Sequence, residues 1–141
     1  MPLWTIHHTP GVFTDADKKE LSERITDRYA EAGLPRFYVV TVFNEIPHGD
    51  MYVGGVAPTA GVRVVIDHIA RRAADQAHRH GIARWVHAIL DPYLSRHPDL
   101  HSEFHIDETS EDLWMINGLI PPPARSEAEQ RWVRENAVSP Y

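Results

Sequence analysis

The sequence of 141 residues contains no cysteine, which excludes disulfide bonds, thiolate metal sites and cysteine nucleophiles. It has no long apolar run, and its amino terminus is typical of a strand rather than of a signal peptide. The formal charge of -6 gives no basic surface, so we expect neither nucleic acid nor a membrane as a partner. These absences predict a soluble cytoplasmic protein.

Ten histidines raise the question of a metal site, because histidine is the commonest metal ligand. His78 and His80 are two residues apart, which on a helix directs them to different faces. His101 and His105 are four residues apart, but they lie in a segment with the pattern of a strand. We therefore interpret the histidines as surface residues and predict neither a metal nor another cofactor.

The order of expected elements is strand, helix, strand in each half of the chain. The hydrophobic content of 43% and the length suit one domain. We predict a first unit with its hairpin at 1–56, a second unit at 61–123 and a helical tail at 124–141. The expected strands cover 2–8, 37–43, 51–53, 61–68 and 104–108, and the expected helices cover 14–32, 71–90 and 126–136.

The first helix has the clearest signals. Thr14 is a candidate N-cap with acidic residues in the first turn, and Gly33 is a candidate C-terminal stop. Leu21, Ile25 and Tyr29 recur every four residues, with Ala32 after them, which predicts one apolar stripe facing a sheet. In the second helix, Asp91-Pro92 is expected to break or restart the helical pattern.

The two halves together predict an α+β fold. In a strand–helix–strand unit the two strands are parallel and the connection is right-handed. Two such units side by side give a four-stranded sheet with two helices on one face. The other face needs a cover that this chain has too few helices to provide, so we predict an oligomer.

The amino terminus is the first candidate for catalysis. If Met1 is removed, Pro2 becomes a secondary amine that can accept and deliver a proton. An apolar pocket disfavours the cationic form of an amine and lowers its pKa toward neutrality, where a general base is most effective. The apolar, strand-like residues that follow Pro2 fit such a pocket, although many proteins begin with Met-Pro.

Arg71 and Arg72 are the candidate anchors for a small carboxylic acid, because a guanidinium binds a carboxylate with two parallel hydrogen bonds. They are expected at the start of a helix, and a solvated helix face is the alternative interpretation. Tyr29 has the position expected of a core tyrosine. His105 is expected on one face of a strand, either as a solvated residue or as a hydrogen-bond partner of the substrate, and Asn117 is expected to be a structural residue of a turn.

The chain resembles the tautomerase superfamily, and within it the cis-3-chloroacrylic acid dehalogenase group. The resemblance spans about residues 2–123 and depends on the order and spacing of several short motifs. They are Met1-Pro2, Ile25-Thr26-Asp27, Phe43-Asn44-Glu45-Ile46-Pro47, Val53-Gly54-Gly55-Val56, His68-Ile69-Ala70-Arg71 and Trp114-Met115-Ile116-Asn117-Gly118-Leu119-Ile120-Pro121-Pro122. The resemblance implies a tautomerase-like fold, a homotrimer and a catalytic amino-terminal proline near a subunit boundary.

The resemblance also implies roles for single residues. Pro2 matches the catalytic proline and Arg71 a carboxylate-binding arginine. The second such arginine of the dehalogenases falls near Ala74, so Arg72 would have to replace it by a different route.

Other family positions are occupied by different residue types. Tyr29 stands where the family has a substrate-binding histidine in its first helix, and His105 where it has a tyrosine that positions water. Ile116 stands where hydrolytic members have the glutamate that activates water, and an isoleucine cannot remove a proton.

The sequence thus predicts a cofactor-independent tautomerase. Pro2 would move a proton between the enol oxygen and the adjacent carbon of a 2-oxo acid, and Arg71 and Arg72 would hold its carboxylate. Tyr29, His105 and Asn117 would line the pocket. Two alternatives remain: a hydratase or dehalogenase of unsaturated acids that activates water through Glu108 or His105, and a non-enzymatic trimeric binding or scaffold protein.

Overall fold

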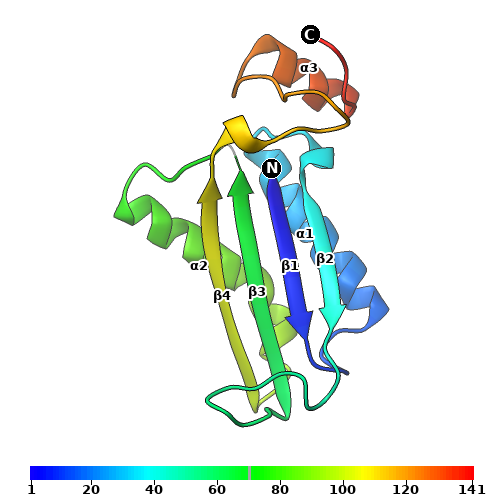
Figure 1. The fold of residues 1–141 in the computed structure, drawn as a ribbon, viewed down its shortest axis with the longest axis vertical. Coiled ribbons are helices and arrows are strands. Elements are labelled where there is room, and N and C mark those ends of the chain that lie inside the picture. Colours follow the sequence, from blue (N-terminus) through cyan, green and yellow to red (C-terminus); the bar gives the residue numbers. More distant parts are fainter. Residues whose placement is uncertain (70) are drawn as a thin grey trace.

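The computed structural model describes residues 1–69 and 71–141, and within them the strands form one four-stranded sheet in the order β2-β1-β3-β4 (Figure 1). Ala70, part of the motif at 68–71, lies outside the described residues. The elements are β1 (Pro2–His8), α1 (Asp15–Glu31), β2 (Val40–Glu45), β3 (Ala60–Ile69), α2 (Gln76–Leu94), β4 (Leu100–Thr109) and α3 (Glu127–Glu135), with short 3-10 helices at Arg36–Tyr38 and Glu111–Leu113.

The pairing of the strands confirms the predicted arrangement of two β-α-β units. β1 is parallel to β2, and β3 is parallel to β4. The two units meet through the antiparallel pair β1–β3, in which Pro2 lies opposite His68. Figure 1 shows α1 and α2 on the same face of the sheet, as expected from right-handed crossovers.

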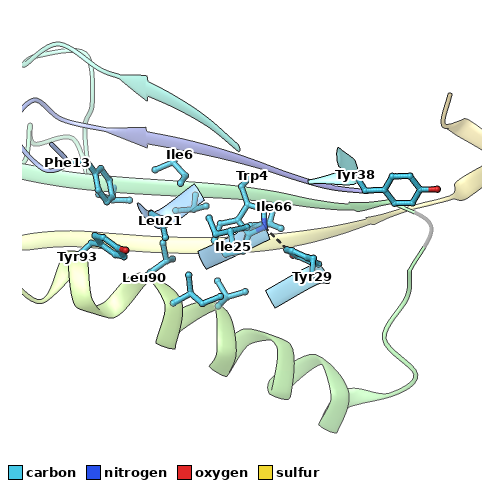
Figure 2. Packing of buried hydrophobic residues seen from close by; sticks show 14 of the residues in the cluster. Trp4, Ile6, Phe13, Leu21, Ile25, Tyr29, Tyr38, Ile66, Leu90 and Tyr93 are labelled. Carbon is cyan, nitrogen blue, oxygen red and sulfur yellow. Dashed lines mark hydrogen bonds between the residues drawn. The ribbon is translucent and has the colours of Figure 1, made fainter. Parts of the chain in front are cut away.

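The core lies between this face and the two helices (Figure 2). Alternate residues of the central strands point into it, because successive side chains of a strand face opposite sides. Leu21, Ile25 and Tyr29 of α1 are buried as predicted, whereas Ala32 is exposed at the C-cap. The fully buried members from β1, α1, β3 and α2 include Trp4, Ile6, Leu21, Ile25, Val62, Val64, Ile66, Val86 and Leu90.

The start of α1 has the predicted cap. The Thr14 hydroxyl accepts a hydrogen bond from the Asp17 backbone N–H, and the Asp17 carboxylate accepts one from the Thr14 backbone N–H. This reciprocal capping box satisfies donors that a helix start otherwise leaves unpaired. At the other end Gly33 adopts the left-handed backbone conformation, with φ of 89°, that glycine tolerates best.

Several predicted boundaries were wrong. The strand expected from residue 37 begins at Val40, because Arg36–Tyr38 forms a 3-10 turn, and the strand expected at 51–53 is only an isolated bridge between Val53 and Val56. β4 is longer than predicted and runs from Leu100 to Thr109.

The second helix also differs from the prediction. It begins at Gln76, after the N-cap Asp75, so Arg71 and Arg72 precede the helix and do not start it. It continues through Pro92 to Leu94. Pro92 has no N–H to donate to the carbonyl of Ala88, so the last turn of the helix lacks this one backbone hydrogen bond.

The carboxyl-terminal segment packs α3 over the end of the sheet where β1 begins and β3 and β4 end (Figure 1). Trp132 is fully buried and lies against the rings of Phe37 and Tyr38. The Phe37 backbone N–H donates to the Asn136 side chain, 3.3 Å away. The tail is thus anchored to its own chain, with Trp132 as the buried anchor.

The sheet face opposite the helices carries a mixture of apolar and polar side chains. By strand alternation it includes Leu3, Val40, Val42, Val65 and His105. Val40 and Val42 are each 39% exposed.

Within the described part of the chain, none of the helices is long and apolar enough to cross a membrane.

Candidate active site

A cavity of about 550 Å³ opens where the chain begins, between the end of α1, the end of β3 and the start of α3. It combines an apolar wall with several cationic side chains. Its described lining residues are Met1, Pro2, Arg28, Tyr29, Ala32, Gly33, Leu34, His68, Ile69, Arg71, Arg72, Ala73, His78, Ile82, Trp85, Ala124, Arg125 and Glu129. Four of the six residues predicted for the site, namely Pro2, Tyr29, Arg71 and Arg72, line this cavity.

The amino-terminal amine lies in the cavity. In the chain with Met1 present, the Met1 amine donates a hydrogen bond to the carbonyl oxygen of Ile69, 2.7 Å away. Burial, and then the nearby Arg71 guanidinium, lower the pKa of this amine to about 5, while Glu129 acts in the opposite direction. Pro2 is buried beside it, and its nitrogen is an amide as long as Met1 is attached.

A buried chain of hydrogen bonds crosses the apolar wall. The Trp4 indole N–H donates to the Tyr29 hydroxyl at 3.1 Å (Figure 2), and this hydroxyl lies 2.6 Å from Nε2 of His68. β1 supplies the tryptophan, α1 the tyrosine and β3 the histidine. The Tyr29 oxygen therefore links three elements of the fold beside the amine.

Tyr29 and His68, the two titratable residues of this hydrogen-bonded series, are both neutral at pH 7. Burial, and then the positive amine, lower the pKa of His68 to about 4, while Glu108 acts in the opposite direction. Burial also raises the pKa of the Tyr29 phenol above its ordinary value. The pair thus offers neutral hydrogen-bonding groups to the cavity.

Arg71 lies in the segment between β3 and α2, where it reaches the carboxylate of Glu129 from α3. Its Nη2 atom is 2.6 Å from Oε1 of Glu129, and the backbone N–H of Arg125 donates to Oε2 of the same carboxylate at 2.6 Å. Glu129 is buried. Burial of a carboxylate is costly unless it is paired and hydrogen-bonded, and here both oxygens have donors.

Other arginines also line the cavity. Arg72 is exposed at the cavity mouth. The guanidinium of Arg28 lies over the Trp85 ring, 5.5 Å from its centroid, which is a favourable cation–π geometry. The cavity therefore has an excess of positive charge that suits an anionic ligand.

His105 and Asn117, the other two predicted site residues, do not line this cavity within one chain. His105 lies on the open sheet face, where Nη2 of Arg63 is 2.7 Å from its Nδ1 and Oδ2 of Asp107 is 3.2 Å from its Nε2. Asn117 is exposed in a turn between Ile116 and Leu119 and has a φ of 49°.

Sequence reasoning missed three residues that the cavity depends on: Trp4, His68 and Glu129. Strand alternation carries a signal for His68, since it follows Val62, Val64 and Ile66 on the face toward the helices. Glu129 had no such signal, because it is 58 residues from Arg71. Among the described residues, no three His, Asp or Glu side chains are grouped as metal ligands would be.

Comparison with known proteins then decides the family. A family model described as "Putative oxalocrotonate tautomerase enzyme" matches residues 1–137. The chain belongs to this tautomerase family. The match confirms the resemblance to the tautomerase superfamily that the motifs indicated.

Solved structures agree with this membership. Native RhCC from Rhodococcus jostii RHA1 is 41% identical, with a TM-score of 0.92 and 99% of each chain covered. "A probable enzyme from the thermophilic fungus Aspergillus fumigatus" is 38% identical, with a TM-score of 0.93, and the match covers 100% of this chain and 98% of that one.

A more distant structure shares the fold alone. The protein N1, a member of the cis-3-chloroacrylic acid dehalogenase family, is 15% identical, with a TM-score of 0.72 and coverage of 95% of this chain and 97% of that one. No match was found among curated proteins.

Proposed function

We propose that the chain is a cytoplasmic, cofactor-independent tautomerase that transfers a proton between the enol oxygen and the adjacent carbon of a small 2-oxo carboxylic acid. The observation that carries the proposal is the half-buried amino-terminal amine, which lies beside Arg71 in the cavity with a pKa lowered to about 5. An amine that is neutral at pH 7 can act as a general base.

Removal of Met1 would transfer this role to Pro2. The amine would move one residue along β1, about 3.8 Å between Cα positions, and Pro2 lines the same cavity. The same burial and the same guanidinium would then act on the secondary amine of proline. Its pKa is therefore expected to lie below its ordinary value.

The proposed reaction has two proton transfers. The neutral Pro2 amine removes the proton of the enol hydroxyl, which leaves an enolate. The C–O bond then becomes a carbonyl as the electron pair of the carbon–carbon double bond takes the proton from the Pro2 ammonium at the adjacent carbon, which restores the neutral amine. Arg71 and Arg72 would bind the carboxylate, because guanidinium groups match carboxylate geometry, and Tyr29 would contact the oxygen at which charge develops.

Proton transfer has more support than hydration. Ile116 has no basic group, pairs through its backbone with Leu119 and does not line the cavity. Of the described lining residues, one is a carboxylate, Glu129, and both of its oxygens already accept hydrogen bonds, from Arg71 and from the Arg125 backbone N–H.

We also propose a homotrimer whose subunits cover one another's open sheet faces. The partly exposed Val40 and Val42 support a cover on that face. His105 lies on the same face and Asn117 in an exposed turn, so the proposal places them near the cavity of a neighbouring copy. Analytical ultracentrifugation should show an assembly of three copies. Val42→Glu, on the open sheet face, should yield monomers, whereas Ala88→Glu, at an exposed position of α2, should not. A monomeric native chain would reject this part.

The proposal is tested first by the intact mass of protein made without an amino-terminal tag. A mass lower by one methionine is expected. The ketonisation of enol-phenylpyruvate, followed by its ultraviolet absorbance, should then be catalysed by the native chain. It should be lost in a chain with extra residues before Pro2 and fall by about a hundredfold or more in Pro2→Ala, the usual range for a general base. Full activity of either altered chain would refute the role of Pro2.

A further inference from the structure

A buried carboxylate from the carboxyl-terminal helix enters the cavity at Glu129. It is 3% exposed, and each of its oxygens has its own donor at 2.6 Å: Nη2 of Arg71 and the backbone N–H of Arg125. The side chain therefore fixes the guanidinium that faces the proposed substrate carboxylate. It does so from a segment that lies far from Arg71 in the sequence.

Docking of the tail does not by itself explain this carboxylate. α3 is already attached through the fully buried Trp132 and through the bond from Phe37 to Asn136. Its first turn is capped by Ser126, whose hydroxyl accepts from the Glu129 backbone N–H at 3.2 Å. The exposed Glu127 supplies a negative charge at the helix start. A buried acid adds a desolvation cost that an apolar side chain would not have.

The charge of Glu129 acts on the amine as well as on Arg71. The titratable and charged groups around the amine come from α1, from β3 and the segment after it, from α2 and from the tail: Arg28, Tyr29, His68, Arg71, Arg72, His78, Arg125 and Glu129. Glu129 is the one acid in this set. It raises the pKa of the amine against burial and Arg71, which lower it.

We propose that Glu129 is a positioning residue: it orients Arg71 toward the substrate carboxylate, and it places a negative charge in the cavity that holds the amine. The inference rests on the proposed function, because it assigns Glu129 a role in the same site. The tail from Ser126 is then part of the active site and not only of the fold.

The decisive variant is Glu129→Gln. A glutamine has an oxygen at one of the two positions where Glu129 has oxygens and an NH2 group at the other. Either Arg71 or the Arg125 backbone N–H therefore loses its acceptor, and the side chain carries no charge. Glu127→Gln is the matched control, because it makes the same charge change two residues away on an exposed position of the same helix. Glu129→Asp keeps the charge and both acceptor oxygens.

We expect two kinetic changes in Glu129→Gln with enol-phenylpyruvate. KM should rise by about tenfold, the size expected for loss of one charge-assisted hydrogen bond, while kcat at the optimum should change by less than about threefold. The acid limb of the kcat/KM profile should move to lower pH, because loss of the negative charge lowers the pKa of the amine. Glu127→Gln should change neither, and Glu129→Asp should restore the position of the limb.

The inference is overturned if Glu129→Gln leaves the acid limb in place, or if KM falls. A lower KM would show that Glu129 competes with the substrate for Arg71 instead of orienting it. Circular dichroism and urea unfolding of each variant show whether it is folded before kinetics are compared.

A second readout separates this inference from the proposed reaction. The rate at which acetic anhydride modifies the amino terminus, followed by intact mass across pH, reports the neutral fraction of the amine without any turnover. A shift of this curve to lower pH in Glu129→Gln supports the role of Glu129 even if enol-phenylpyruvate is not a substrate. An unshifted curve rejects it even if the chain is an active tautomerase.

Discussion

Removal of the Tyr29 hydroxyl should destabilise the protein far more than the loss of one exposed oxygen would. In Tyr29→Phe the indole N–H of Trp4, a fully buried residue, loses its acceptor, and Nε2 of His68 loses its partner at 2.6 Å. A buried polar group without a partner costs about 1–3 kcal/mol. With His68 slightly exposed, at 8%, we expect the free energy of unfolding to fall by about 2–4 kcal/mol.

Tyr93→Phe is the matched control. The Tyr93 hydroxyl donates to the carboxylate of Glu20 at 3.0 Å, and Glu20 is exposed, so water can replace the lost donor. We expect a loss of about 0.5–1.5 kcal/mol in this variant.

The assay is urea unfolding followed by tryptophan fluorescence. Both variants and the native chain are compared at one protein concentration, because the stability of an oligomer depends on concentration. An equal loss in Tyr29→Phe and Tyr93→Phe would refute the reasoning, since it would show that the groups around Tyr29 regain partners. A changed dependence on urea concentration would instead point to an altered unfolded state.

The remaining predictions concern His68, the ion pair of Arg71, and the tail. Burial lowers the pKa of His68 from its ordinary value of 6.5 to about 4 in the folded chain. The unfolded state therefore binds more protons between these pH values, and stability falls as pH drops through them, by about 3 kcal/mol at most. Urea unfolding from pH 7 to pH 4 should show a smaller fall in His68→Gln. Arg71→Gln leaves the buried Glu129 carboxylate without its cation and should cost about 3–5 kcal/mol in the same assay at pH 7, whereas a cost under about 1 kcal/mol would contradict the buried pair. Trp132→Ala empties a fully buried site and should cost about 3–5 kcal/mol by urea unfolding, while Val133→Ala, at a position 37% exposed, should stay within about 0.5 kcal/mol; equal losses would show that the tail is not anchored through Trp132.

Much of the fold could be predicted from the sequence because its signals are local. The repeat of Leu21, Ile25 and Tyr29 marks the buried face of α1, and Thr14 and Gly33 mark its ends. These signals depend on helix geometry within one segment. The order of elements then limits the topology to parallel units with right-handed crossovers.

Boundaries that depend on neighbours were harder to predict. Phe37 and Tyr38 have strong strand propensity, yet they form a 3-10 turn and pack against Trp132 of the distant tail. Pro92 is a helix breaker in most contexts, yet it lies within the last turn of α2, where Tyr93 is buried. In both places tertiary packing outweighs local propensity.

The candidate site shows the same division. The sequence by itself named Pro2 and Arg71 as candidates and showed an isoleucine in place of an acid at position 116, because residue types and their order along the chain can be read without the fold. Only the tertiary structure decided that His68 and Glu129 share a cavity with them. The antiparallel β1–β3 pair places His68 opposite Pro2, and the packing of α3 carries Glu129 across 58 residues of sequence to Arg71. A pKa follows from burial and from neighbouring charges, so the chemistry of this amine depends on contacts that exist only in the folded chain.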